Sequence, residues 1–400
     1  MGSGILFYAT LLVAVAAGWS IAWVSLRSRY QSKRSVKDIY HDYFVGLNYL
    51  LGDEPDEAID TFIRALEINS DTIETHLALG TLLRRRGKVD KAIKVHQELL
   101  ARPELDSQFS DSVRLELSHD YVAAGLLDRA EQLLKELLSD SSESKLNALF
   151  QLTTVYQIEK EWQEAIDAIK TLLADPRYRK DKSIRSVGAH FCCELAEQAM
   201  ANEQPQVARD HIKNAFRFDR NSARASFLMA RLEKMTNNLA RAIKELVRIR
   251  NLHPEFISEI IEPMAECYQQ LGEKGDIREF EKFLLSCLDD QPRASTLLKL
   301  VELVRTGDSE ASAMVLLSSR LRQNPSLKGI VAMLQVHVSK TEGQLQHDLL
   351  QTVEILKLLL QAKPGYQCDQ CGFETRSLYW QCSSCQKWDT VKPHLGIDGE

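Results

Sequence analysis

The feature that most constrains the fold of this chain is a repeat of 34 residues near its N-terminal end. Glycine recurs from Gly46 to Gly80 and alanine from Ala58 to Ala92 at that separation, and apolar residues follow each alanine at helical spacing. Small residues at fixed points of such a pattern indicate where two helices approach closely. Each unit is therefore predicted to be a pair of antiparallel helices. Because one pair cannot cover its own apolar stripe, neighbouring units are expected to stack.

The period and its small-then-large pattern resemble the tetratricopeptide repeat. The pattern continues with drift across residues 38–363, and about eight helix pairs are expected. An ordinary helical bundle is the alternative, but it requires the matched positions to coincide by chance. We therefore predict an all-α, tetratricopeptide-repeat superhelical solenoid with a concave face, whose later units fall around residues 121–137, 156–172, 208–242, 268–272, 303–307 and 327–360, the last broken near Gly343.

One spacing departs from the period. From Ala165 to Ala208 it is 43 residues, so extra residues are inserted around 175–186. This segment is strongly basic. It fits either a docking loop or a solvated connection, and the solvated connection is expected.

A run without charged residues extends from Ile5 to Leu26, long enough at about 1.5 Å per residue to cross a hydrocarbon core of roughly 30 Å. Basic residues follow from Arg27 to Lys37, which predicts that the chain after Arg27 is cytoplasmic and the N-terminus periplasmic. A cleaved signal peptide is the alternative, although the run lacks a basic n-region. We predict a single-pass transmembrane anchor at 1–28 and a basic juxtamembrane segment at 29–37.

Eight cysteines fall into two groups. Four lie in helical sequence and are expected to pack as small apolar residues: Cys192, Cys193, Cys267 and Cys287. The other four form two Cys-x-x-Cys turns, and two such turns make a tetrahedral sulfur site for one metal ion. These predicted ligands are Cys368, Cys371, Cys382 and Cys385. Disulfide pairing is the alternative, which a reducing cytoplasm disfavours.

The segment 364–400, called the knuckle below, resembles a rubredoxin-type metal site. Gly372 suits a left-handed position after the first cysteine pair, whereas Ser383 and Gln386 replace the usual Pro and Gly of the second turn. The second turn is therefore less certain to offer the N–H···S bonds that tune iron. Because no flavin or nicotinamide fingerprint accompanies the site, structural zinc is expected, with iron as the rival.

The knuckle holds five aromatic residues, enough to wrap a metal but not to fold a core alone: Tyr366, Phe373, Tyr379, Trp380 and Trp388. Its short connection to the preceding helix predicts that it docks on the final helices, around 353–360.

The combination of anchor, repeats and knuckle resembles the lipopolysaccharide assembly protein B family of Gram-negative bacteria nearly end to end. The most specific stretches are 74–80, 86–93, 120–126 and 371–393. The resemblance implies an inner-membrane adaptor that delivers the LpxC deacetylase of lipid A synthesis to the membrane AAA+ protease FtsH. It also implies restraint by an inner-membrane lipopolysaccharide-sensing protein. The concave repeat face is expected to hold protein partners, with no residues assigned.

Two other functions stay open: a non-proteolytic scaffold for lipopolysaccharide synthesis or transport proteins, and a rubredoxin-like electron carrier. A net charge of −6 with interspersed signs gives no indication of nucleic acid. The sequence contains no nucleophile elbow, phosphate loop or zinc-protease helix motif, so no catalytic residue is predicted and an enzyme is not expected.

Overall fold

The computed structural model describes residues 73–397 and 399, apart from 104, 140–141, 273–276 and 308, together with the isolated positions Trp19 and Val45. The predicted anchor between Ile5 and Leu26, the basic segment and the first repeat lie outside this described part. Among the described residues, no helix combines the length and the apolar character needed to cross a bilayer.

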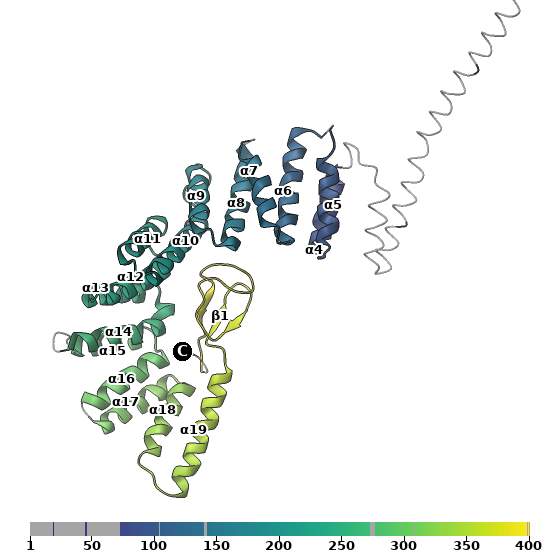
Figure 1. Cartoon of the computed structure of the whole chain (residues 1–400). Coiled ribbons are helices and arrows are strands. Elements are labelled where there is room, and N and C mark those ends of the chain that lie inside the picture. Colours follow the sequence, from purple (N-terminus) through teal and green to yellow (C-terminus); the bar gives the residue numbers. More distant parts are fainter. Residues whose placement is uncertain are drawn as a thin grey trace, which may run out of the picture. The chain divides into compact units, whose positions relative to one another are not determined.

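The chain divides into two compact parts, Met1–Val155 and Tyr156–Glu400, which we describe separately. The first contains α4 (Ile73–Arg85), α5 (Val89–Leu100), α6 (Ser107–Ala123), α7 (Leu127–Leu137) and the start of α8 (Ser142–Glu159). In this part α4 packs on α5, α5 on α6, and α6 on α7 (Figure 1). The close approach predicted at Gly80 is confirmed, because a Cβ there would lie 2.3 Å from the His96 ring.

A buried polar cluster joins α4, α5 and α6. Nδ1 of His96 lies 2.5 Å from Oδ2 of Asp120, and both side chains are fully buried. Arg84 donates to Asp120 at 2.7 Å and to Glu116 at 2.8 Å. Asp120 lies on another helix, 24 residues from His96 in the chain, so no local spacing in the sequence indicates this pair. Asp120 of α6 thus pairs with Arg84 of α4 and with His96 of α5, which links the three helices through one buried carboxylate.

The second part continues as a series of helices. They are α9 (Trp162–Ala174), α10 (Lys182–Ala201), α11 (Pro205–Phe218), α12 (Ala223–Met235), α13 (Leu239–Leu252), the 3₁₀ turn η2 (Pro254–Phe256), α14 (Ile257–Leu271), α15 (Ile277–Asp290), α16 (Ala294–Gly307), α17 (Glu310–Gln323), α18 (Leu327–Val338) and α19 (Gln344–Ala362). Successive helices contact one another from α9 to α19. The predicted break in the last pair is confirmed, since α19 begins after Gly343 at a φ of 71°.

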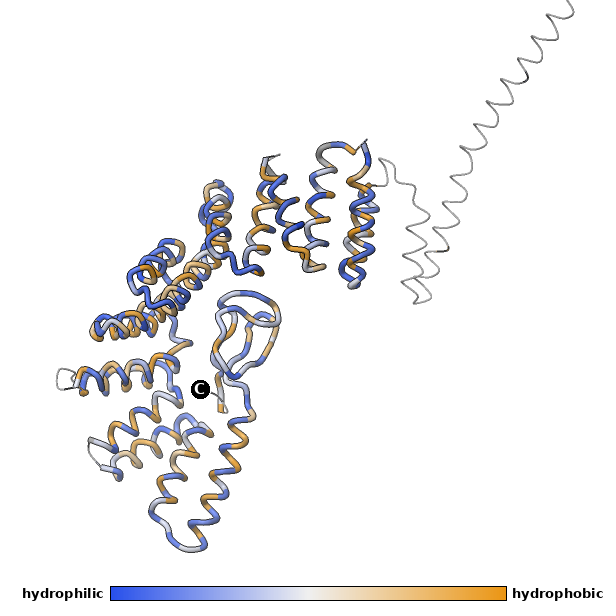
Figure 2. The backbone as a smooth tube through the Cα atoms, in the orientation of Figure 1, coloured by the Kyte–Doolittle hydropathy of each residue, from blue (hydrophilic) through white to orange (hydrophobic). Residues whose placement is uncertain are grey.

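Apolar residues recur along the described helices, as the orange positions of the tube in Figure 2 show, and most of these helices bury them on one side. The last helix, α19, buries only Val353. A continuous core runs from α12 to α17 and contains the fully buried Phe256 and Phe280. Burying each such side chain contributes about 1.5–3 kcal/mol. All four helical cysteines are buried, which confirms their expected packing role.

The insertion around 175–186 forms a short connection and the first turn of a long helix α10. Asp181 caps this helix by accepting hydrogen bonds from the backbone N–H groups of Ser183 (2.8 Å) and Ile184 (3.1 Å). Arg185 donates to the carbonyl oxygens of Phe218 at 2.8 Å and Arg217 at 2.9 Å, at the C-terminal end of α11. The inserted residues thus brace α10 against α11.

After α19 the chain forms a small antiparallel sheet of β1 (Tyr366–Cys368), β2 (Glu374–Thr375) and β3 (Val391–Pro393), in the order β2-β1-β3. Tyr366 pairs with Pro393 and Cys368 with Val391, so the first ligand cysteine is fixed in register with the closing strand. This sheet positions the metal site.

Candidate metal centre

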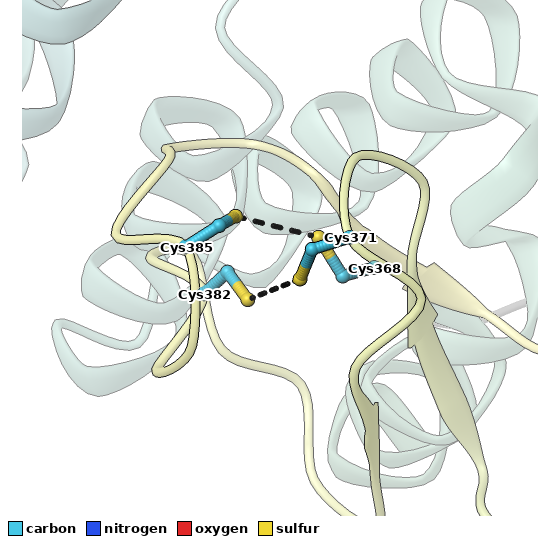
Figure 3. A group of neighbouring side chains, drawn as sticks. All are labelled: Cys368, Cys371, Cys382 and Cys385. Carbon is cyan, nitrogen blue, oxygen red and sulfur yellow. Dashed lines mark hydrogen bonds between the residues drawn. The ribbon is translucent and has the colours of Figure 1, made fainter. Parts of the chain in front are cut away.

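The four cysteines of the knuckle converge on one point (Figure 3). Their sulfur atoms all lie within 4.8 Å of one another. Cys368 Sγ is 3.8 Å from Cys385 Sγ, and Cys371 Sγ is 3.7 Å from Cys382 Sγ. A tetrahedron with metal–sulfur bonds of about 2.3 Å has sulfur–sulfur edges of about 3.8 Å, whereas a disulfide requires about 2.05 Å. The cluster therefore fits one tetrahedral metal ion.

The two Cys-x-x-Cys turns have the same backbone hydrogen bonds. In the first, Cys368 N–H donates to Phe373 O (2.8 Å) and Gly372 N–H to Cys368 O (2.9 Å). In the second, Cys382 N–H donates to Lys387 O (2.9 Å) and Gln386 N–H to Cys382 O (2.9 Å). The left-handed position predicted for Gly372 is confirmed by its φ of 74°, and Gln386 takes φ 58° without being glycine.

Hydrogen bonds favour the thiolate at Cys368. Burial raises the pKa of this thiol, but the Thr390 hydroxyl and backbone N–H groups of the turn lower it to about 6. At Cys385 the backbone N–H of Lys387 lowers the pKa, whereas burial and the three neighbouring thiols raise it to about 11. Four thiolates at this spacing repel one another unless a cation neutralises them, so the cluster favours a bound divalent metal.

The turn residues give a matched pair of predictions. Gly372→Ala should destabilise the knuckle by about 1 kcal/mol through its left-handed backbone alone, because a Cβ at this position meets nothing within 4 Å. Gln386→Gly should stabilise the second turn, because glycine adopts the left-handed backbone without strain. The loss of the hydrogen bond from Gln386 Nε2 to Ser383 O offsets part of this gain. Metal release to a chelator should be faster in the first variant and slower in the second. Equal rates in both would contradict the strain argument.

Trp388 anchors the knuckle to the helices. Its ring stacks on His190 of α10 with centroids 4.9 Å apart and meets Phe191 edge-on at 6.0 Å. The guanidinium of Arg224 on α12 lies 5.6 Å from the centre of the same ring. Trp388 Nε1–H donates to Oε1 of Gln157, in the last turn of α8, at 2.9 Å. One side chain thus contacts three helices.

A second set of contacts docks the knuckle on η2 and α14. Trp380 packs against Phe256 at a centroid distance of 5.4 Å and against Phe227 at 5.8 Å. Tyr366 donates from its hydroxyl to Glu259 at 2.8 Å. Lys392 lies over the Phe256 ring at 4.5 Å and pairs with Glu255 at 3.4 Å.

The docking site expected on the final helices around 353–360 is wrong. The exposed fractions of Ile355, Leu358 and Leu359 are 59%, 65% and 55%. Within the described residues, one backbone hydrogen bond joins the knuckle to the last helix pair, from Leu327 N–H of α18 to Ile397 O at 3.0 Å. A short connection fixes how far the knuckle can lie from α19 but not the direction in which it turns.

Of the five aromatic residues expected to wrap the metal, Tyr366 does so, because it packs against the buried cluster of Cys368, Cys382 and Val391. Trp380 and Trp388 contact helices rather than wrap the metal, while Phe373 and Tyr379 are exposed. The residues that receive them, His190 and Arg224, were not identified as functional. A usable signal was present: five aromatic side chains exceed what so small a module can bury alone, which predicts a docking surface elsewhere in the chain.

His190 makes docking of the knuckle dependent on pH. Burial, with Arg224 and Lys392 nearby, lowers the pKa of His190 to about 3, and its Nδ1 has no hydrogen-bond partner among the described residues. Once undocked, His190 regains its ordinary pKa of about 6.5 and binds a proton below that pH. Docking is therefore fully stable above pH 6.5 and weakens as pH falls towards 3, by about 2 kcal/mol at pH 5.

The matched variant is His190→Phe, which keeps a ring against Trp388 but cannot titrate. Chemical unfolding of both proteins at pH 7 and pH 5 should show the larger loss in the wild type. Acid loss of metal from the thiolates is common to both and cancels in the comparison. The same loss in both proteins would contradict the role of His190.

Two family models match this chain. Residues 366–393 match the rubredoxin metal binding domain, and residues 75–108 match the tetratricopeptide repeat. The fold and the site thus define a tetratricopeptide-repeat protein with a rubredoxin-type metal-binding domain.

Whole-chain relatives narrow this class. Lipopolysaccharide assembly protein B of Escherichia coli K12 is 35% identical over 98% of this chain and 99% of its own length. The protein of that name from Haemophilus influenzae is 28% identical over 97% of this chain and 98% of its own length. The chain belongs to the lipopolysaccharide assembly protein B family.

Solved structures give a weaker likeness. A tetratricopeptide repeat protein from Parabacteroides merdae is 15% identical, covers 67% of this chain and 99% of its own, and has a TM-score of 0.36. PilF of Pseudomonas aeruginosa is 18% identical, covers 55% of this chain and 93% of its own, and has a TM-score of 0.31.

Proposed function

We propose that this protein is an inner-membrane adaptor that regulates lipopolysaccharide synthesis by promoting proteolysis of the LpxC deacetylase by the AAA+ protease FtsH. The observation that carries the proposal is the near end-to-end match to relatives named for lipopolysaccharide assembly. The docked knuckle is consistent with an adaptor, because its contacts with α10, α12 and α14 place repeats and knuckle side by side, where one partner can contact both.

The proposed domain division follows the sequence: anchor at 1–28, basic segment at 29–37, repeats at 38–363 and knuckle at 364–400. In this arrangement the anchor confines the cytoplasmic repeats to the bilayer, where the protease and a lipopolysaccharide-sensing protein gain effective concentration. The adaptor performs no chemistry of its own on the deacetylase.

We propose that the knuckle holds one zinc ion through Cys368, Cys371, Cys382 and Cys385. Zinc would supply a tetrahedral cross-link between the two turns and no redox chemistry. The chain's own residues do the rest: β1 and β3 fix Cys368, and Thr390 hydrogen-bonds its sulfur at 3.3 Å. An electron carrier with iron is the competing role, and metal analysis separates the two, because a zinc protein is colourless.

The second candidate is a scaffold that assembles lipopolysaccharide enzymes or transporters without promoting degradation. The half-life of the deacetylase distinguishes it from the adaptor. Removing an adaptor lengthens that half-life in cells, whereas removing a scaffold leaves it unchanged.

A further inference from the structure

A cavity of about 590 Å³ opens between α9, α10 and α11. Its volume lies within the range of about 300–1,000 Å³ typical of ligand pockets. The apolar floor is formed by Ile166, Leu173, Cys192 and Phe218. We call this cavity the α9–α11 pocket. It is separate from the knuckle and its docking contacts, and the function proposed above does not use it.

The polar lining of the pocket is basic. Lys170 of α9 and Arg217 of α11 are exposed. Arg185, in the first turn of α10, is half-buried. No aspartate or glutamate is among the residues that line the pocket. Five acidic residues adjoin the lining residues in the sequence: Glu164, Asp167, Asp175, Asp210 and Asp219. Of these, Asp167 and Asp210 pair with Lys170 (2.8 Å) and Lys213 (3.3 Å). Because both pairs are largely exposed, they hold their lysines weakly and leave Lys170 available to another anion.

The remaining lining residues offer hydrogen-bonding groups suited to a peptide. Gln163 Nε2 already donates to Asp167 (3.1 Å), and Asn214 Oδ1 accepts from Arg217 (2.8 Å). The carbonyl oxygen of Gln163 and the NH₂ group of Asn214 therefore supply one acceptor and one donor, and His211 adds a ring nitrogen. Burial lowers the pKa of His211, although Asp210 raises it, so this ring is neutral near pH 7. Amides match the alternating N–H and C=O groups of a peptide backbone, whereas an acyl chain would leave them without partners.

We propose that the α9–α11 pocket binds a short acidic and apolar peptide segment of a partner protein. Its carboxylates pair with Lys170 and Arg217, and an apolar side chain packs on the floor. Arg185 acts as a positioning residue, because its bonds to the carbonyls of α11 hold that helix beside the pocket.

The test uses the purified full-length chain and a fluorescein-labelled octapeptide of alternating glutamate and leucine, followed by anisotropy. Lys170→Glu and Arg217→Glu reverse exposed charges in the pocket and should not disturb the core. Lys244→Glu, an exposed residue of α13 outside the pocket, makes the same charge change as a control. An octapeptide of alternating lysine and leucine tests the sign of the ligand, and dihexanoyl phosphatidic acid tests a lipid.

The proposal expects saturable micromolar binding of the acidic peptide that weakens in high salt. Each pocket reversal should reduce affinity by about tenfold or more, with Lys244→Glu unchanged. Absence of binding, equal loss in the control variant, or equal binding of the basic peptide would overturn it. So would charge-dependent binding of the phosphatidic acid without the peptide, which would make the pocket a lipid site. The binding assay does not involve the deacetylase. Its outcome therefore tests the pocket separately from the proposed adaptor function.

Discussion

Trp388→Ala is expected to release the knuckle from the helices while leaving its metal bound. The substitution removes the stacking on His190, the edge contact with Phe191 and the hydrogen bond to Gln157. Replacing a packed tryptophan by alanine costs about 3–5 kcal/mol. None of the four ligand cysteines is changed, so the metal site should persist. Docking and metal binding are thus separated in one variant.

Limited trypsin digestion measures the release, because cleavage after Lys387, the residue before Trp388, should become faster when the knuckle undocks. Metal content should stay at one ion per chain. Tyr379→Ala is the matched control, since Tyr379 is an exposed aromatic residue of the same knuckle. Wild-type digestion of Trp388→Ala would contradict the anchoring role of this tryptophan.

Cys371→Ser is expected to unfold the knuckle itself. Cys371 is exposed, so the substitution buries no new polar group and leaves no cavity. It removes one of four soft ligands, and structural zinc supplies about 10–16 kcal/mol of folding free energy to modules of this size. Loss of a residue that only hydrogen-bonds to a metal ligand typically lowers metal affinity by about 10–100-fold. Because Cys371 is itself a ligand, its replacement should lower zinc affinity by more than about a hundredfold.

The unfolding should stay local. Solenoid helices are stabilised by their neighbours, so helical circular dichroism should remain close to wild type while metal content and near-ultraviolet tryptophan signals are lost. Ser384→Ala, in the second turn, changes an exposed residue that is no ligand and serves as the control. Retention of stoichiometric metal by Cys371→Ser would show that the four sulfurs do not act as one site.

Local sequence patterns predicted much of the fold. The recurrence of Gly80 and Ala92 located helix crossings that the structure contains, and the broken last pair at Gly343 was also predicted. Two Cys-x-x-Cys turns could be recognised because each is complete within four residues. These features depend on neighbours in the chain, so the sequence alone shows them.

The docking of the knuckle could not be predicted in this way. Trp388 bonds Gln157 across 231 residues and Tyr366 bonds Glu259 across 107, and no periodic pattern records such pairs. The same holds for His96 and Asp120, whose pairing depends on how α5 packs on α6. Gln386 shows a different limit: a residue that disfavours the left-handed region adopts it because the two hydrogen bonds of the turn hold it there.

The half-life of the deacetylase tests the central claim most directly. It should be followed after protein synthesis is stopped, in cells that carry the wild-type gene, a deletion, Trp388→Ala or Tyr379→Ala at native expression. The adaptor account predicts rapid loss of the deacetylase with the wild type and Tyr379→Ala, and a lengthened half-life with the deletion and Trp388→Ala. An unchanged half-life in the deletion strain would contradict the account.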